Sequence, residues 1–197
     1  RFDDESEYKQ MAAVGVTFLF LMSLRKEIRM QNMFNNKKEP NLLSYLDLVA
    51  LGTVCDVVEL KHFNRLFVLK GLELIHKRYH KGISKLIDNS KLNTPPSSQD
   101  IGYIVGPQIN AASRIDDSSL ASKLLITNDI EQIEKISRKL YLLNEKRKLI
   151  ESKILESANE QAELQKDSKY ILVYGENWHQ GVLGIVASKL LDIYNKP

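Results

Sequence analysis

The sequence predicts an α/β protein that is mainly helical, and three patterns support this fold class. Apolar residues recur at helical spacing along most of the chain. Residues 129–169 contain neither glycine nor proline, which favours one long helix. Residues 170–174 (Tyr-Ile-Leu-Val-Tyr) form a short β-prone run that Gly175 ends, and a helical pattern follows at 181–194. Strand, turn and helix in this order predict the start of a second, α/β domain.

Composition excludes several classes of protein. The 197 residues are 27% charged and 43% hydrophobic, which fits a soluble globular chain and excludes disorder, collagen and a coiled-coil rod as descriptions of the whole. A net charge of +3 is too small to indicate nucleic acid or a membrane by itself. The single cysteine, Cys55, excludes an internal disulfide framework and a Cys-rich zinc site, and it favours the reducing cytoplasm.

The two ends of the chain lead us to expect an internal fragment of a longer protein. No signal peptide opens the sequence, and the longest uncharged run, residues 10–24, is shorter than the about 20 apolar residues of a transmembrane helix. The chain begins with Arg1 and stops at Pro197, directly after an apolar helical pattern. We expect no membrane partner and a division into three parts: 1–128, 129–168 and 169–197.

Helices account for most of the first part. Residues 8–30 carry apolar side chains at helical spacing and end in a basic turn, and the polar run 32–41 predicts a loop. Residues 42–58 form a second apolar stretch, whose small and uncharged centre suits close packing. The 3.6-residue pattern of 63–76 predicts another helix.

Prolines and aspartates mark the next boundaries. The prolines of residues 91–98 predict a loop. Glycine and proline at 106–107 break or start a helix within 101–112. The run 116–119 (DDSS) offers N-caps for a short helix through Ile126.

The helix predicted for residues 129–169 would be about 55–60 Å long at 1.5 Å per residue. Its nine acidic and nine basic residues balance, which describes a solvated face rather than a nucleic-acid groove. A helix of this length bridges two lobes or packs as a coiled coil, and we favour the bridge.

Asp56 is the first candidate for chemistry, in the run GTVCDVV (52–58). Burying an aspartate among apolar residues costs on the order of several kcal/mol unless it is paired or metal-bound. Asp56 is therefore either a cap at a helix end or a hard oxygen ligand for Mg²⁺ or Mn²⁺. One carboxylate cannot hold a catalytic metal, so further ligands must come from elsewhere.

The second candidate is the run GPQINAASR (106–114). A helix start at glycine-proline leaves backbone N–H groups free to bind an anion. Asn110 and Arg114 lie four residues apart on one helical face, where both can reach a phosphate. The alternative is a surface ion pair of Arg114 with Asp116 or Asp117.

The third candidate is the run NWHQGVLGI (177–185), between the predicted strand and the last helix. In α/β sheets this is where ligands bind. Trp178 either stacks on a base or packs in the core, and His179 either handles phosphate and protons or donates in a turn. The GVLG run has the GXXG pattern of KH domains, which is too common to count.

Several other functions lack support. The sequence contains no P-loop, no nucleophile elbow and no dinucleotide fingerprint. His62, His76 and His80 lack the spacing of zinc ligands. The basic run 146–148 is predicted to be solvent-exposed, and Cys55 is predicted to pack between helices rather than to act as a nucleophile.

Three ordered runs resemble motifs of the RecJ family, the single-strand-specific DNA exonucleases of the DHH phosphoesterase superfamily. They are LDLVALGTVCDVV (46–58), GPQINAASR (106–114) and WHQGVLGIVASK (178–189). A fourth run, AAVGVTF (12–18), is similar to the helix that follows the family's Asp-His-His motif. The resemblance extends nearly from end to end of the chain.

The resemblance implies a fold and an activity. Residues 1–128 would be the mainly helical C-terminal part of a DHH domain, 129–168 the connecting helix, and 169–197 the start of a DHHA1-type α/β domain. The implied activity is a 5′-to-3′ exonuclease that hydrolyses phosphodiester bonds of single-stranded DNA in repair and recombination. The family uses Mn²⁺ or Mg²⁺ to activate water and to stabilise charge on the phosphate.

The resemblance also implies roles for single residues. Asp56 matches the family's late metal-binding aspartate. Asn110 and Arg114 match a motif that lines the active site, with Arg114 as a phosphate ligand. His179, the candidate catalytic residue, matches the start of the second domain, which closes over the nucleic acid, and Trp178 beside it is a candidate DNA contact.

Departures from the family pattern limit what the chain does alone. It has no His-His pair and no Asp-x-Asp, so the remaining metal ligands are expected outside it. Gln108 and Lys189 stand where arginine is common, and Ser113 where glycine is. We therefore expect no DNA cleavage by this chain alone. The alternatives are a DHH-superfamily phosphodiesterase for oligonucleotides or cyclic dinucleotides, and a degenerate fragment or helical interaction domain.

Overall fold

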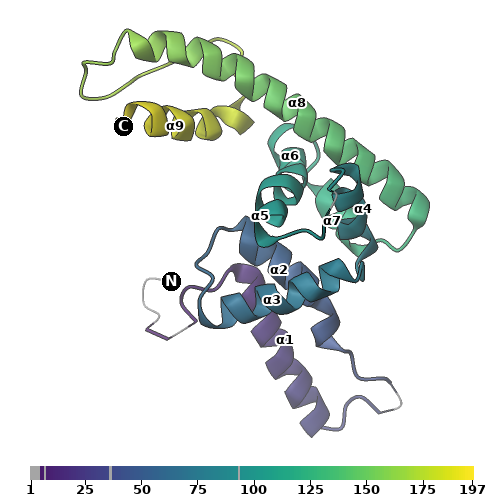
Figure 1. Ribbon diagram of the computed structural model, residues 1–197. Coiled ribbons are helices and arrows are strands. Elements are labelled where there is room, and N and C mark those ends of the chain that lie inside the picture. Colours follow the sequence, from purple (N-terminus) through teal and green to yellow (C-terminus); the bar gives the residue numbers. More distant parts are fainter. Residues whose placement is uncertain (1–4, 7, 36, 93) are drawn as a thin grey trace.

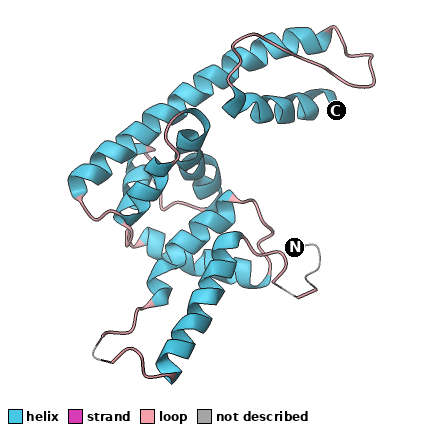
Figure 2. Cartoon of the chain, turned by 180° about the vertical axis from the view of Figure 1, so that it is seen from behind, coloured by secondary structure: helices cyan, strands magenta, loops and turns pink. Residues whose placement is uncertain are grey.

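The computed structural model describes residues 5–6, 8–35, 37–92 and 94–197, and the regular elements in these ranges are helical (Figures 1 and 2). A 3₁₀ turn, η1 (Leu42–Tyr45), leads into the second helix, and a π-helical turn, η2 (Ile101–Val105), joins the fifth to the sixth. The helices are α1 (Ala13–Met30), α2 (Leu46–Cys55), α3 (His62–His76), α4 (Lys81–Asn89), α5 (Ser98–Asp100), α6 (Gly106–Ile115), α7 (Ser119–Ile126), α8 (Ile130–Glu163) and α9 (Gln180–Tyr194).

Residues 170–174, predicted as a strand, form no strand: Leu172 and Tyr174 bond to glutamine side chains, and the amide of Ile171 donates to the carbonyl of Pro197 at 2.9 Å. Gln165 accepts from the amide of Leu172 at 3.0 Å and donates to its carbonyl at 2.8 Å. Gln161 bonds to Tyr174 in the same way, at 3.1 and 2.8 Å. A strand needs a neighbouring strand as its hydrogen-bond partner. Here the side-chain amides of Gln161, in the last turn of α8, and of Gln165, just after that helix, take its place. The predicted mainly helical character is therefore confirmed for the described residues, whereas the strand that made the prediction α/β is not formed in them.

The first three helices pack around a small apolar cluster. Phe18 of α1 and Phe67 of α3 meet edge to face, with ring centroids 5.3 Å apart, in the same cluster as Leu46 and Val49 of α2. Helix α3 crosses α2 very closely at Gly71, where an added Cβ would lie 2.2 Å from the carbonyl oxygen of Leu46. This crossing fixes α2, whose C-terminal end carries the first candidate run, 52–58 (the first motif). The runs 106–114 and 177–185 are the second and third motifs.

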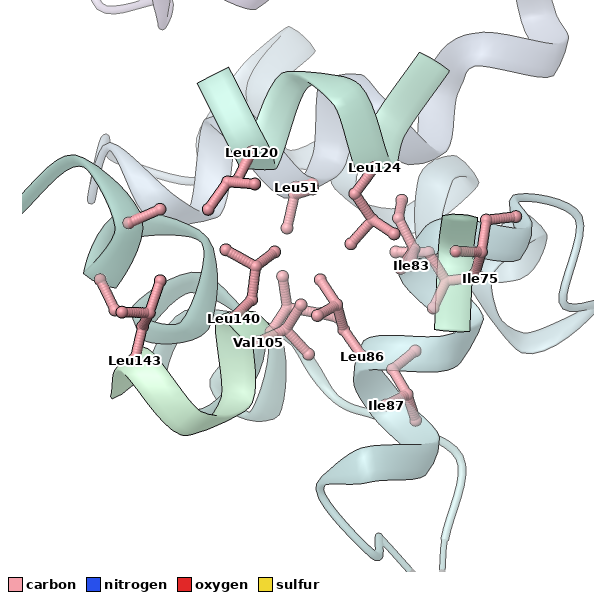
Figure 3. Close-up of a cluster of buried hydrophobic side chains, with 14 residues drawn as sticks. Leu51, Ile75, Ile83, Leu86, Ile87, Val105, Leu120, Leu124, Leu140 and Leu143 are labelled. Atoms are coloured by element: carbon pink, nitrogen blue, oxygen red, sulfur yellow. The ribbon is translucent and has the colours of Figure 1, made fainter. Parts of the chain in front are cut away.

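The main core lies where α2, α3, α4, α6, α7 and the first half of α8 converge (Figure 3). Leu86 of α4, Leu124 of α7 and Leu140 of α8 are fully buried there. Burying each such side chain contributes about 1.5–3 kcal/mol. Helix α4 had not been predicted, although its Ile83, Leu86 and Ile87 follow helical spacing and face this core. The core fixes the helices of the first two motifs relative to each other.

Helix α8 runs from the main core to α9, with which it forms a third apolar cluster (Figures 1 and 2). Asp129 caps its first turn, accepting from the amide of Glu131 at 2.9 Å. Its 34 residues span about 51 Å at 1.5 Å per residue, which is shorter than the predicted 129–169. Ile154 and Ala158, near its far end, pack against α9. Its assignment as a connector between two domains stays a prediction.

Candidate metal and nucleic-acid site

Asp56 caps the C-terminal end of α2 with an exposed side chain. Its amide donates to the carbonyl of Gly52 at 3.0 Å, and no hydrogen bond or ion pair engages its carboxylate in the described part of the chain. In the same residues, no three His, Cys, Asp or Glu side chains gather into a metal-binding group. An exposed and unengaged carboxylate fits one oxygen ligand of a divalent ion. The metal role of Asp56 stays a prediction.

Cys55 joins the first motif to the second. Its Sγ lies against Gly106 at the start of α6, where an added Cβ would come within 2.7 Å. Burial, and to a smaller extent the charge of Asp56, raises the pKa of the Cys55 thiol to about 11. The thiol is therefore protonated at neutral pH, in agreement with a packing role.

The second motif does not begin at a free helix N-terminus, contrary to prediction. Helix α5, η2 and α6 follow one another without a break, and the amide of Gly106 donates to the carbonyl of Ile101. Pro107, the next residue, has no N–H. The anion site predicted at this helix start is therefore wrong, because helical hydrogen bonding continues through it.

Gln108, where the family commonly has arginine, is buried between α4 and α6. Its Nε2 donates to the hydroxyl of Ser90 at 2.8 Å and to the carbonyl of Ile104 at 3.0 Å. Gln108 therefore contributes to the interior of the fold and not to a surface that could bind phosphate.

Arg114 contacts the third motif rather than its neighbouring aspartates. Its Nη1 donates to the carbonyl of Gly181 at 3.1 Å. Asp116 and Asp117 pair instead with lysines of α8 and α7, at 2.9 and 3.7 Å, so the alternative pairing with Arg114 is wrong. Asn110 lies exposed on α6, one helical turn before Arg114.

His179 is the N-cap of α9, and its Nδ1 accepts from the amide of Gly181 at 3.1 Å. An N–H group can donate only to an unprotonated ring nitrogen, so the proton of the neutral ring sits on Nε2. Trp178 is half-buried beside the cluster that α8 and α9 form. Gly175 lies against its indole, where an added Cβ would come within 2.2 Å of Nε1. Trp178 therefore packs, and its stacking on a base stays a prediction.

Helices α6 and α9 meet at Arg114 and Gly181, which brings the second and third motifs together (Figure 1). The contact requires glycine, because a Cβ at Gly181 would lie 2.0 Å from the carbonyl oxygen of Arg114. Helix α6 also packs against Cys55 of the first motif. Three runs that are far apart in the sequence are thus connected through α6.

A buried carboxylate ties α8 to α9. Glu151 accepts from Arg147 of α8 at 2.8 Å and from Lys189 of α9 at 2.7 Å. The Nε of Arg147 also donates to Asn144 at 3.2 Å. The prediction that 146–148 is solvent-exposed is therefore wrong for Arg147, whose guanidinium turns toward Glu151. Sequence reasoning missed this network, although the i, i+4 spacing of Arg147 and Glu151 was a signal for it.

A different aspartate, Asp47 in the first turn of α2, is the buried one, and sequence reasoning missed it too. Its Oδ1 accepts from the amide of Leu48 at 2.8 Å, but its Oδ2 and the Nδ1 of His80 are both buried without a hydrogen-bond partner. The Nε2 of His80 bonds to the carbonyl of Leu125 at 2.7 Å. Burial raises the pKa of Asp47, against smaller opposing effects of the Leu48 amide and the His80 charge.

Asp47→Asn is expected to raise the free energy of unfolding by about 1 kcal/mol at pH 8. Because the pKa of Asp47 is raised, its contribution to stability is full below the ordinary value of 3.8 and is lost as the pH rises through the raised value. Asparagine carries no charge at any pH, so the stability of Asp47→Asn lacks this pH dependence. The difference in free energy of unfolding between the variant and the unaltered chain should therefore shrink as the pH falls toward 4. Urea unfolding at several pH values measures it, and a gain independent of pH would contradict burial of the charge as the cause.

Comparison with known proteins shows what the chain is similar to. No protein-family model matches the chain. The single-stranded-DNA-specific exonuclease RecJ of Haemophilus influenzae is 37% identical over 196 residues, which cover 96% of this chain and 34% of the relative. RecJ of Escherichia coli is 35% identical over 198 residues, with the same coverage. The chain thus spans about a third of the length of these curated relatives.

Solved structures give the same result. A crystal structure of RecJ from Thermus thermophilus with Mg²⁺ aligns with a TM-score of 0.85 and 30% identity, covering 100% of this chain and 30% of that one. The same protein with Mn²⁺ aligns with a TM-score of 0.79 and 31% identity, and the match covers 91% of this chain and 26% of that one. Among the described helices, none combines the length and the apolar character that a membrane span requires. Over nearly its whole length, this chain is related in sequence and in fold to RecJ single-stranded-DNA-specific exonucleases, and the matching segment makes up about one third of each of those proteins.

Proposed function

We propose that this chain is part of a metal-dependent 5′-to-3′ exonuclease that hydrolyses single-stranded DNA in repair and recombination in the cytoplasm. The observation that carries the proposal is the contact of Arg114 with Gly181, which joins two motifs of the RecJ pattern across α6 and α9. The named activity of the relatives supports the same substrate. Residues 1–128 are then part of a DHH domain, 129–168 the connector, and 169–197 the start of a DHHA1-type domain.

The chain's own groups suit the handling of a phosphate. Asp56 offers a hard oxygen ligand to Mn²⁺ or Mg²⁺, which when bound activates water and stabilises charge on the phosphate. One N–H of Arg114 donates to the carbonyl of Gly181, and its other guanidinium N–H groups can donate to phosphate oxygens.

Two further groups complete the proposed contacts. The amide of Asn110, exposed one turn before Arg114, adds a second donor on α6. His179, held by its bond to Gly181, keeps the Nε2 proton free to donate to a phosphate oxygen. Trp178, half-buried beside it, offers its indole to a base.

We further propose that the chain alone does not cleave DNA. A metal-assisted hydrolysis requires several oxygen or nitrogen ligands around each ion. Asp56 is one such ligand, and the described residues form no group of three His, Cys, Asp or Glu. The remaining ligands are supplied by chain outside these 197 residues.

The test compares the chain alone with a chimera, in which the chain replaces the matching segment of the Haemophilus influenzae relative. Degradation of single-stranded DNA labelled at the 5′ or the 3′ end is followed with Mn²⁺ and with EDTA, and the intact relative is the positive control. We expect Mn²⁺-dependent release from the 5′ end by the chimera and none by the chain alone. Release by the chain alone would contradict the missing ligands, and a folded but inactive chimera would contradict the proposed function.

A further inference from the structure

A surface hollow of about 280 Å³ lies at the C-terminal end of α2, where Cys55 and Val57, the two sequence neighbours of Asp56, line it. One wall is the segment that follows Asp56, with Val57, Val58 and Leu60, and the other is the π-helical turn η2, with Tyr103. The hollow is largely apolar, and it is separate from the Arg114–Gly181 contact.

The backbone on both sides of the hollow is unusual. Val57 has φ 54°, in the left-handed region that a β-branched residue rarely adopts, and its side chain is 89% exposed. Val57 follows the C-cap of α2, where helices commonly end with a left-handed residue, as Arg78 does after α3. Residues 101–105 form a π-helical turn, a feature that is frequent at functional sites.

Tyr103 presents its ring to solvent at the rim of the hollow. It is 83% exposed, whereas Ile101 and Val105 of the same turn are fully buried. The core therefore gains little from the aromatic ring of Tyr103. An exposed aromatic face next to an apolar wall is a platform on which a nucleobase stacks.

The platform is held firmly against the Asp56 end of α2. An added Cβ at Gly102 would come within 3.2 Å of Val54, and one at Gly106 within 2.7 Å of the Sγ of Cys55. The two glycines thus allow η2 and the start of α6 to lie against the last turn of α2. This packing positions the backbone of Tyr103 relative to the end of α2 that carries Asp56.

We propose that Tyr103, with Val57 and Leu60, forms a stacking site for one nucleobase of single-stranded DNA beside the Asp56 metal position. The proposal rests on the proposed function and deepens it. Bases in a duplex already stack on each other and pair, so only a single strand can turn a free base face to Tyr103. The site therefore gives a physical reason for a preference for single strands.

The test measures binding of a 5′-phosphorylated oligodeoxynucleotide to the whole chain by fluorescence anisotropy, with Mn²⁺ present. Tyr103→Ala should weaken binding by about 5- to 150-fold, the change that corresponds to about 1–3 kcal/mol for one stacked base. Tyr103→Phe keeps the ring and should stay within about twofold. Tyr79→Ala removes another exposed tyrosine, 60% exposed, from outside the hollow and is the matched control.

Oligonucleotides with a single abasic position identify the occupant. If Tyr103 stacks on one base, removing that base weakens binding by the chain but has no further effect on Tyr103→Ala. Equal binding by Tyr103→Ala and Tyr79→Ala contradicts the stacking site alone. A loss with Tyr103→Ala that persists at every abasic position also contradicts it. No binding by the unaltered chain contradicts the stacking site, whereas the degradation assay with the chimera tests the proposed function separately.

Discussion

Gly71→Ala should lower the free energy of unfolding by about 2–3 kcal/mol, although alanine is the better helix former by about 1 kcal/mol. The new Cβ would lie 2.2 Å from the carbonyl oxygen of Leu46 and 2.3 Å from the Cβ of Ala50. Neither atom can rotate away, since both are fixed by the backbone of α2. The crossing of α2 and α3 must therefore open, and with it the support of the helix that ends beside Asp56.

Urea unfolding followed by circular dichroism measures this effect. Gly184→Ala is the control, because Gly184 also lies inside a helix but has nothing within 4 Å of an added Cβ. The free energy of unfolding of that variant should rise by up to about 1 kcal/mol, because alanine has the higher helix propensity. If Gly71→Ala behaves like Gly184→Ala, the close crossing of α2 and α3 is contradicted.

Gly181→Ala should separate the start of α9 from α6, at a cost of about 2–3 kcal/mol confined to that contact. Its Cβ would lie 2.0 Å from the carbonyl oxygen of Arg114. The bond from Arg114 to the Gly181 carbonyl is then lost, and the His179 cap on the Gly181 amide is strained.

Trp178, the single tryptophan, reports this separation through its fluorescence, and hydrogen exchange of the α9 amides reports it independently. We expect a changed emission and about 100-fold faster exchange in the first turn of α9. Gly184→Ala, three residues further along the same helix, should change neither. Unchanged emission and exchange in Gly181→Ala would contradict the contact between the second and third motifs.

Local patterns in the sequence predicted much of the helical fold. Residues 63–76 were predicted as a helix that the structure places at His62–His76, and Asp129 caps α8 at the predicted start. These features depend on side chains within a few residues of each other, which periodicity and capping rules describe. Helix α4 was missed because it is only nine residues long and lies between loops.

Contacts between distant residues could not be predicted in this way. The β-prone run 170–174 has its partners in Gln161 and Gln165, which no strand rule anticipates. Arg114 bonds to Gly181, 67 residues away, rather than to the adjacent aspartates. The two aspartates at opposite ends of α2 have similar apolar neighbours in sequence, and only the packing of α2 shows that the first is buried and the second exposed.

That pair of aspartates offers the most direct test of the central claim, that the exposed end of α2 supplies a metal ligand to a single-strand exonuclease. In the chimera, Asp56→Asn should reduce Mn²⁺-dependent degradation of single-stranded DNA at least about 100-fold, because a lost metal ligand removes several kcal/mol of charge stabilisation. Asp47→Asn makes the same chemical change at the buried end of the same helix and should leave the rate within about threefold. Equal rates for the two variants would contradict the claim.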